Sequence, residues 1–442
     1  MRVPMPCSRV VWTERTNPYD ELAYRCLPIE WTAPERLALA STLHGGPRLD
    51  TDACRVLELG CGDGANLLPM AHHRNRASFV GVDGAASQIA LANERRALLN
   101  LKNARFIHAD FRQAEHLLDG EFDVIIGHGI FSWVPDDARD VLLSLCRKAL
   151  RPGGLLYLNY NTYPGWSLRG MVREFLLAQT AHGGDLRERA LQAQQVAKQI
   201  AGSFGSAGQA DASPYSRLLA NEFLFVGEHD LSYVAHEFLS EINRAYWRSD
   251  FLALLRSHGF EFVADADFNY SSGRLPVHFA LQLKNFDWVG RAVEDTADLL
   301  CNRQLHSPIL TRGAHPSRPL GTCEFAEFSL ASCLVPLPVR EDRALWFQHP
   351  PTGYEVETRK TAMAVALSRL HPRWPRGLRV ADLFNDVAAV MEDLLLLHRN
   401  GLLELRLAEP ADPVADSRPL ARLEAQLGGY ATTRYHTRIA AA

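Results

Sequence analysis

The chain has 442 residues, 47% of them hydrophobic and 22% charged, which is the composition of a globular protein with room for about two to four domains. Its net charge of −4 provides no field that would recruit nucleic acid or an anionic membrane. No run approaches the ~20 apolar residues of a membrane span, and the eight cysteines are scattered without a C-x-x-C pair. We therefore expect a cytoplasmic protein with reduced thiols, no metal site, and neither nucleic acid nor membrane as partner.

Residues 1–49 are irregular and rich in Pro, Trp and Tyr, with one helix predicted over residues 33–43. Thr32 is the candidate N-cap of that helix, and Pro34 fits its first turn.

A predicted strand then runs into a glycine turn at Gly60, Gly62 and Gly64. Glycine lets the backbone approach a ligand closely and adopt otherwise costly dihedral angles. The G-x-G-x-G spacing differs from the G-x-G-x-x-G of dinucleotide-binding folds. Taken alone, the turn indicates a nucleotide-type ligand without saying which one.

Four more strands are predicted, over residues 78–83, 105–110, 122–129 and 154–161. Asp83 and Asp110 end the first two of these. Ligands of parallel sheets bind at the carboxyl ends of the strands. Asp83 is placed to accept hydrogen bonds from ribose hydroxyls, and Asp110 from an adenine amino group.

Helical periodicity dominates residues 167–247, with a Gly- and Ser-rich loop predicted over 202–213. A helix over residues 250–258 precedes alternating segments at 260–264 and 277–283, which are plausible sixth and seventh strands. The helical block is then an insertion between strands five and six. A helix over 294–305 and a linker marked by Pro308, Pro316 and Pro319 follow.

The pattern of residues 325–408 indicates a separate small domain, and the order of its predicted helices and strands resembles a winged helix. Between residues 340 and 407 there are ten basic and nine acidic residues, a net charge of +1. A DNA reader needs a basic face. We therefore favour a structural or protein-contact module.

The ordered strands, glycine turn and strand-end acids resemble the class I S-adenosylmethionine-dependent methyltransferases over about residues 50–165. Four further segments are similar to bacterial methyltransferases that carry a methyltransferase regulatory domain. These segments are Asn17-Pro18-Tyr19-Asp20, residues 125–135, residues 159–166, and residues 233–239, which include His236-Glu237. That group includes the rickettsial enzymes that methylate lysines of outer-membrane proteins. The resemblance is good over about residues 17–310, and it departs from the family at Gly84 and Ala85.

The resemblance implies an α/β fold with a Rossmann-like seven-stranded sheet, a helical insertion and a C-terminal winged-helix-like domain. The implied parts are a lid segment (1–49), the cofactor-binding core (50–166), the helical insertion or regulatory region (167–246), the last two strands (247–286), a helix and linker (287–324), and the C-terminal domain and tail (325–442).

The implied cofactor is S-adenosyl-L-methionine. Its predicted contacts are Tyr24, Glu58, Gly60, Gly62, Asp63, Asn66, Asp83, Asp110, Phe111 and His128. Glu58 lies near the methionine amino group in the family, and Tyr24 belongs to the lid. Asp63 is equally well read as a helix N-cap.

The candidate catalytic residues are His128, Tyr160 and Asn161, with His128 as a polar contact or proton acceptor. Phe131, Trp133, Tyr163 and Trp166 are candidate substrate-binding aromatics, although they could equally pack the insertion onto the core. For His236-Glu237, a structural helix pair is favoured. An amine acceptor must lose its proton before it can attack, and neither a metal nor a covalent intermediate is needed.

The favoured reaction is methyl transfer to a protein side-chain amine of the lysine type. One alternative is a small-molecule O- or N-methyltransferase of a biosynthetic pathway. Another is a regulatory module that binds S-adenosylmethionine without catalysis. The partner is accordingly a protein or a small-molecule methyl acceptor, and a homodimer is left open.

Overall fold

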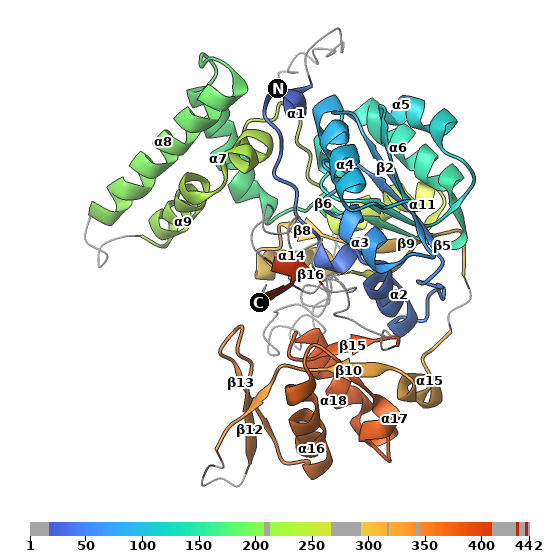
Figure 1. The fold of residues 1–442 in the computed structure, drawn as a ribbon. Helices are drawn as coiled ribbons and strands as arrows, with labels where there is room; N and C mark the ends of the chain where they lie inside the picture. The colour runs from blue at the N-terminus through green and yellow to red at the C-terminus, as the bar shows by residue number, and fades with distance from the viewer. Residues whose placement is uncertain are drawn as a thin grey trace.

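The computed structural model of the protein describes residues 17–206, 213–266, 293–315, 318–338, 340, 344–408, 430–432 and 438–440. Its centre is a seven-stranded sheet in the order β3-β2-β1-β4-β5-β9-β7 (Figure 1). The strands are β1 (Arg55–Leu59), β2 (Ser78–Asp83), β3 (Ala104–His108), β4 (Phe122–Gly127), β5 (Leu150–Leu158), β7 (Phe260–Asp265) and β9 (Pro308–Arg312). The first five run parallel, and β9 is antiparallel to β5 and β7. The predicted seven-stranded Rossmann-like sheet is confirmed.

One strand of this sheet comes from a segment that the sequence predicts to be a linker. In β9, Leu310 pairs with Leu156 of β5 on one side and with Phe262 of β7 on the other. Pro308 is the first residue of β9, a position at which a strand tolerates proline. The strand predicted over residues 277–283 lies outside the described residues, and β9 occupies the place beside β5.

Helices cover both faces of the sheet because alternate residues of the central strands point to opposite sides. Val124 and Ile126 face one layer, whereas Ile125 faces the other. The first layer contains α2 (Pro34–Leu43), α3 (Leu67–His73) and α4 (Ala86–Leu98), and the second contains α5 (Phe111–Ala114), α6 (Asp136–Ala149) and α11 (Arg248–Ser257).

The predicted capping of α2 by Thr32 is wrong. The N-cap residue is Ala33, which makes no side-chain cap. The Thr32 hydroxyl instead donates to the Ile29 carbonyl at 2.8 Å, within the preceding short 3₁₀ turn η1 (Glu30–Thr32).

A helical arm stands beside the core sheet (Figure 1). It contains α7 (Trp166–Gln179), α8 (Leu186–Ser206), α9 (Pro214–Glu228), α10 (Leu231–Tyr233) and the π-helix η4 (Val234–Phe238). The arm has a hydrophobic core of its own, in which Leu176, Phe223 and Phe238 are buried. Helix α8 continues to Ser206, into the segment predicted to be a loop.

The C-terminal domain packs below the core in Figure 1 around a third hydrophobic cluster. Ion pairs Arg36–Glu404 (3.2 Å) and Arg48–Glu324 (2.9 Å) join it to the core. Its elements are α15 (Thr322–Ala326), β10 (Ser329–Ala331), β11 (Val335–Pro336), β12 (Leu345–Gln348), β13 (Glu355–Thr358), α16 (Thr361–Leu370), β14 (Leu378–Arg379), α17 (Val380–Leu383), α18 (Ala388–Arg399) and β15 (Glu404–Arg406). The likeness to a winged helix stays a prediction.

The remaining elements are α14 (Val293–Cys301), the pair β6 (Tyr160–Asn161) and β8 (Leu305–His306), and the hairpin β16 (Tyr430–Thr432) and β17 (Arg438–Ala440). Within the described part of the chain, no helix has both the length and the apolar character needed to cross a bilayer.

Candidate active site

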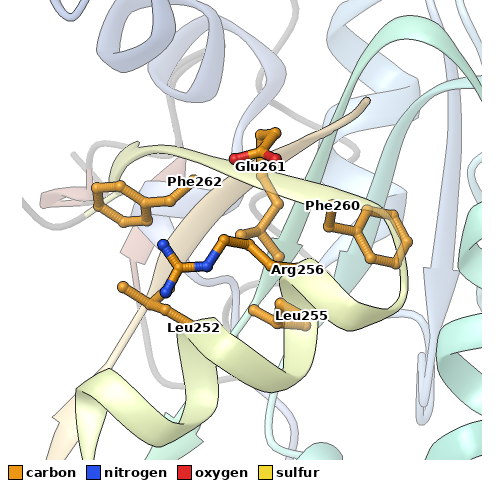
Figure 2. A pocket seen from close by; sticks show the side chains of 7 residues that line it. Leu252, Leu255, Arg256, Phe260, Glu261 and Phe262 are labelled. Carbon is orange, nitrogen blue, oxygen red and sulfur yellow. The ribbon is translucent and has the colours of Figure 1, made fainter. Parts of the chain in front are cut away.

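A hollow between α11 and β7 contains none of the predicted site residues (Figure 2). Its lining includes Phe260, the first residue of β7. Because β9 is antiparallel to both β5 and β7, β7 runs in the same direction as the five parallel strands. The hollow therefore lies toward the amino edge of the sheet. The predicted residues gather at the opposite, carboxyl edge.

The glycine turn follows β1 at that carboxyl edge. Gly60, Gly62 and Gly64 have φ angles of 73°, 51° and 77°, which are left-handed conformations that glycine adopts readily. A Cβ atom on Gly60 would lie 2.3 Å from Ile130 Cγ2, and one on Gly62 would lie 2.4 Å from Cys26 Sγ. Both backbone shape and close packing therefore require glycine here.

Glu58, near the end of β1, has one carboxylate oxygen without a partner in the described protein. Its Oε1 accepts a 2.8 Å hydrogen bond from Asn66 Nδ2, whereas Oε2 is buried and accepts none. Burial raises the pKa of Glu58 to about 8. A buried acceptor of this kind needs a donor, and the ammonium group of an amino-acid ligand would supply one. This fits the predicted position of the methionine amino group.

Asp83 ends β2 and holds the glycine turn in place. Its Oδ2 accepts from the Gly62 backbone N–H and its Oδ1 from that of Ala85, both at 2.8 Å. Burial raises the pKa of Asp83, and these two backbone hydrogen bonds oppose the rise. Each oxygen keeps a second lone pair. Asp83 can therefore shape the turn and also accept from two ribose hydroxyls.

The side chains of Asp63 and Asn66 are used within the protein. Asp63 accepts from the Ala65 N–H at 3.0 Å and pairs with Arg95 at 2.6 Å. Asn66 donates to Glu58 and accepts from the Ile29 N–H at 2.9 Å. Both residues therefore shape the loop. Their direct contact with the cofactor stays a prediction. Asp63 is not the N-cap of α3, a position that Asn66 occupies.

Strand β3 ends at His108, two residues earlier than predicted, so Asp110 lies just beyond it as the N-cap of α5 and Phe111 begins that helix. The Asp110 carboxylate caps α5 by accepting from the Arg112 N–H at 2.8 Å, and its side chain is 51% exposed. Phe111 is half-buried against the second core layer. Their contact with adenine stays a prediction.

The N-terminal segment, residues 17–32, crosses the carboxyl edge of the sheet between core and helical arm (Figure 1). Asp20 accepts from the Ser87 N–H at 2.8 Å at the start of α4, and Trp31 Nε1 donates to the Tyr157 hydroxyl at 2.8 Å. The Arg25 N–H donates to Ser232 of the arm at 3.1 Å. Tyr24 belongs to this anchored segment, and its role as a lid residue over the cofactor stays a prediction.

His128 follows β4 and is held as a neutral ring. Asn159 Oδ1 accepts from the Gly129 N–H at 2.6 Å, which turns its Nδ2 toward His128 Nδ1 at 3.1 Å. An amide nitrogen can only donate, so Nδ1 is an acceptor and the hydrogen is on Nε2. Burial lowers the pKa of His128 to about 4. The predicted role of proton acceptor is therefore disfavoured, and His128 is better placed to donate from Nε2.

Of the other predicted catalytic residues, Tyr160 is part of the core. Its ring stacks on Phe251 at 3.6 Å and on His306 at 5.7 Å, and it is 2% exposed. This packing encloses the ring, and a contact of Tyr160 with substrate stays a prediction. Asn161 is also buried, but its Nδ2 atom has no hydrogen-bond partner among the described residues.

The predicted aromatic wall divides into two sets. Phe131 is fully buried against Phe251 at 5.0 Å and belongs to the core. Trp133 and Trp166 meet edge to face at 6.1 Å, and Trp166 Nε1 donates to Asn243 at 2.8 Å. Tyr163 is half-buried, 6.1 Å from Trp247. Substrate contact stays a prediction for Trp133, Tyr163 and Trp166.

Sequence reasoning missed the residues that orient His128. These are Asn159 and Tyr157, whose hydroxyl lies 2.9 Å from His128 Nδ1. Both belong to the predicted fifth strand, yet only the paired geometry of β4 and β5 shows that they face His128.

Comparison with known families assigns two segments of the chain to described domains. Residues 56–154 match a methyltransferase domain, and residues 230–312 match a predicted methyltransferase regulatory domain. Residues 56–154 therefore form a methyltransferase domain, and its sheet has the Rossmann-like order of class I. The regulatory-domain match begins in the helical arm and continues through β7 to the end of β9, so it supplies two strands of the methyltransferase sheet.

The fold and parts of the sequence are similar to those of known proteins, and the chain spans just over half of the length of one curated relative. The fold is similar to that of PKMT2 from Rickettsia typhi in complex with AdoHcy, with a TM-score of 0.79, 22% identity, and coverage of 95% of this chain and 86% of that chain. An uncharacterized protein of Rickettsia prowazekii is 30% identical over 328 residues, which are 74% of this chain and 58% of the relative. Trans-aconitate 2-methyltransferase of Deinococcus radiodurans is 33% identical over 102 residues, 23% of this chain and 36% of that enzyme.

Proposed function

We propose that the protein binds S-adenosylmethionine and transfers its methyl group to a side-chain amine of a protein. The unpartnered, buried Oε2 of Glu58 beside the glycine turn carries the cofactor half of this proposal. The likeness to PKMT2 over nearly the whole chain and the resemblance to lysine-methylating enzymes support the acceptor half.

The cofactor, when bound, supplies a methyl group already activated as a sulfonium. The protein has to bind the cofactor and the acceptor, orient them for transfer, and exclude water from the site. Glu58 accepts from the amino group, Asp83 accepts from the ribose hydroxyls, and the glycine turn allows close backbone approach. The N-terminal segment, tied down through Asp20 and Trp31, covers the edge. The Nε2 hydrogen of His128 is a fixed donor there.

A small-molecule acceptor is the second candidate. Trans-aconitate 2-methyltransferase matches this chain over about the length of the methyltransferase domain. A stretch of this chain is thus similar in sequence to a protein named for a small-molecule acceptor.

Calorimetry with S-adenosylhomocysteine tests the cofactor site. We expect Asp83→Ala to weaken binding at least tenfold, because a charge-assisted hydrogen bond contributes ~1.5–3 kcal/mol. Asp119→Ala removes a carboxylate that is 90% exposed and should leave the affinity unchanged. Absence of binding by the wild type would overturn the proposal.

Transfer of tritiated methyl groups to host lysate tests the acceptor. Label in the protein fraction, located on lysine after hydrolysis, supports the proposed function. Label in small molecules alone establishes the second candidate. Binding of the cofactor analogue with label in neither fraction would indicate a module that binds the cofactor without catalysis.

A further inference from the structure

Three tyrosine side chains lie within electrostatic reach of the Glu237 carboxylate where the N-terminal segment crosses the helical arm. Tyr19 and Tyr24 come from the segment, and Tyr233 and Glu237 come from α10 and η4; we call these four the acid–tyrosine cluster. His236 lies among them, with its ring stacked on Tyr19 at 4.1 Å and edge-on to Tyr24 at 5.8 Å. Its Nε2 lies 2.6 Å from the Leu22 carbonyl, which anchors the segment. Glu237 lies in a π-helix, a form often found at functional sites.

The polar ends of the cluster have no partner within the described protein. No hydrogen bond or ion pair joins the three phenol oxygens or the Glu237 carboxylate to another described residue. All four residues are half-buried, so the cluster lies below the surface without being sealed in the core. A carboxylate and three phenols that are left without partners are available to a ligand.

Glu237 lacks a bound cation although two arginines are near. The charges of Arg169 and Arg173 lower the pKa of Glu237, but burial outweighs them and raises it to about 7. Arg169 pairs with Glu222 at 3.3 Å, and Arg173 donates to the Ser240 carbonyl. Burial raises the pKa of each of the three phenols, and the nearby Glu237 charge raises it further.

The cluster adjoins the cofactor site through the same N-terminal segment. The Tyr19 phenol lies within electrostatic reach of both Glu237 and Asp83. Two residues after Tyr24, the Cys26 sulfur packs against Gly62 of the glycine turn. A group held by the cluster therefore lies beside the edge at which the cofactor is proposed to bind.

We propose that the acid–tyrosine cluster binds the ammonium group of the methyl acceptor and that Glu237 takes its proton. This inference rests on the proposed function and names the residues that select a cationic acceptor. Phenol faces and a carboxylate attract a cation, and a carboxylate near neutrality is a suitable base. The ammonium N–H proton passes to Glu237, and the freed lone pair forms the N–CH₃ bond while the CH₃–S bond breaks and sulfur keeps that electron pair.

The test compares Glu237→Gln with Glu228→Gln, which removes a charge from the exposed surface of the same arm. Binding of Nα-acetyl-lysine amide to the AdoHcy-loaded protein is followed by NMR titration. We expect Glu237→Gln to weaken this binding at least tenfold and to lower kcat at least a hundredfold, while AdoHcy affinity stays within twofold. The control should match the wild type in all three measurements. Below pH 7 the wild-type rate should fall as Glu237 becomes protonated.

Equal binding of the lysine probe by wild type and Glu237→Gln, with AdoHcy bound normally, would overturn this inference alone. Failure of the wild type to bind AdoHcy would overturn the proposed function and this inference with it. If Glu237→Gln does not fold, Tyr233→Leu provides the same comparison. It should weaken probe binding at least fivefold, and unchanged probe binding would count against the cluster.

Discussion

His306 Nε2 lies 2.7 Å from Asp298 Oδ2 in the interior of the protein, and Asp265 lies 3.8 Å from Nδ1 on the other side of the ring. Burial lowers the pKa of His306, but the two carboxylates outweigh it and raise the pKa above its ordinary value. The ring also stacks on Tyr160. This buried group joins α14 and β7 to the strand pair β6–β8.

The raised pKa of His306 predicts a stability that falls in mild alkali. Its contribution is complete below the unfolded pKa of about 6.5 and is lost as the pH rises through the folded pKa. We expect the melting temperature to fall between pH 7 and 9, and His306→Gln to lower stability at pH 6 and reduce that fall. Calorimetry from pH 6 to 9 checks this, with the exposed His116→Gln as control. An unchanged pH profile in His306→Gln would contradict it.

The raised pKa of Glu58 also predicts a stability that falls as the pH rises, but over a lower pH range. Its pKa is raised to about 8 in the folded protein, so between about pH 4.5 and 8 the unfolded chain loses a proton that the folded protein keeps. The free energy of unfolding of the cofactor-free protein should fall over this range. Glu58→Gln should flatten that fall and add about 1–3 kcal/mol at pH 8.

The same substitution should weaken AdoHcy binding at least tenfold, because the ligand ammonium loses its charged acceptor. Urea unfolding across pH and calorimetric binding measure the two effects. A variant that binds AdoHcy as tightly as the wild type would remove Glu58 from the site.

His128 should remain neutral, with its hydrogen on Nε2, from pH 5 to 9. The pKa is lowered by burial to about 4, and Asn159 occupies Nδ1. Long-range ¹H–¹⁵N NMR spectra read the tautomer directly. Asn159→Asp places a negative charge beside the ring and should raise the His128 pKa by at least about one unit. A wild-type ring that titrates near 6.5 would refute this arrangement.

Gly62→Ala should abolish AdoHcy binding within the measurable range while the protein stays folded. The added Cβ would lie 2.4 Å from Cys26 Sγ, in addition to the strain of a φ of 51°. Gly313→Ala is the matched control, since its φ is 72° and nothing lies within 4 Å of the new atom. It should cost about 1 kcal/mol of stability and leave binding intact. Equal binding by both variants would show that Gly62 is not needed.

The sequence predicts those parts of the fold that depend on local pattern. Alternation and the glycine turn identify the first five strands; Asp83 ends β2 as predicted, and Asp110 lies two residues beyond the end of β3. Strand β9 is not predicted, because proline is common in linkers and only four residues of the strand follow Pro308. Its partners, Leu156 and Phe262, are distant in the chain, so no local pattern reveals the pairing.

The same limit applies to the site. Glu58 and Asp83 could be proposed from the sequence because a motif places them at the ends of neighbouring strands. Whether Tyr160 faces a ligand or the core depends on Phe251, ninety-one positions later, which forms the stack that buries it. The availability of Glu237 likewise depends on where Arg169 and Arg173 direct their hydrogen bonds.

The placement of β9 has a consequence for biosynthesis. This strand separates β5 from β7, yet it ends at residue 312, after the whole helical arm. A nascent chain can pair its five parallel strands as they leave the ribosome, but β7 has no neighbour until β9 emerges. We therefore expect fragments that stop before residue 308 to expose the edge of β5, and a separately produced piece spanning residues 50–166 to aggregate.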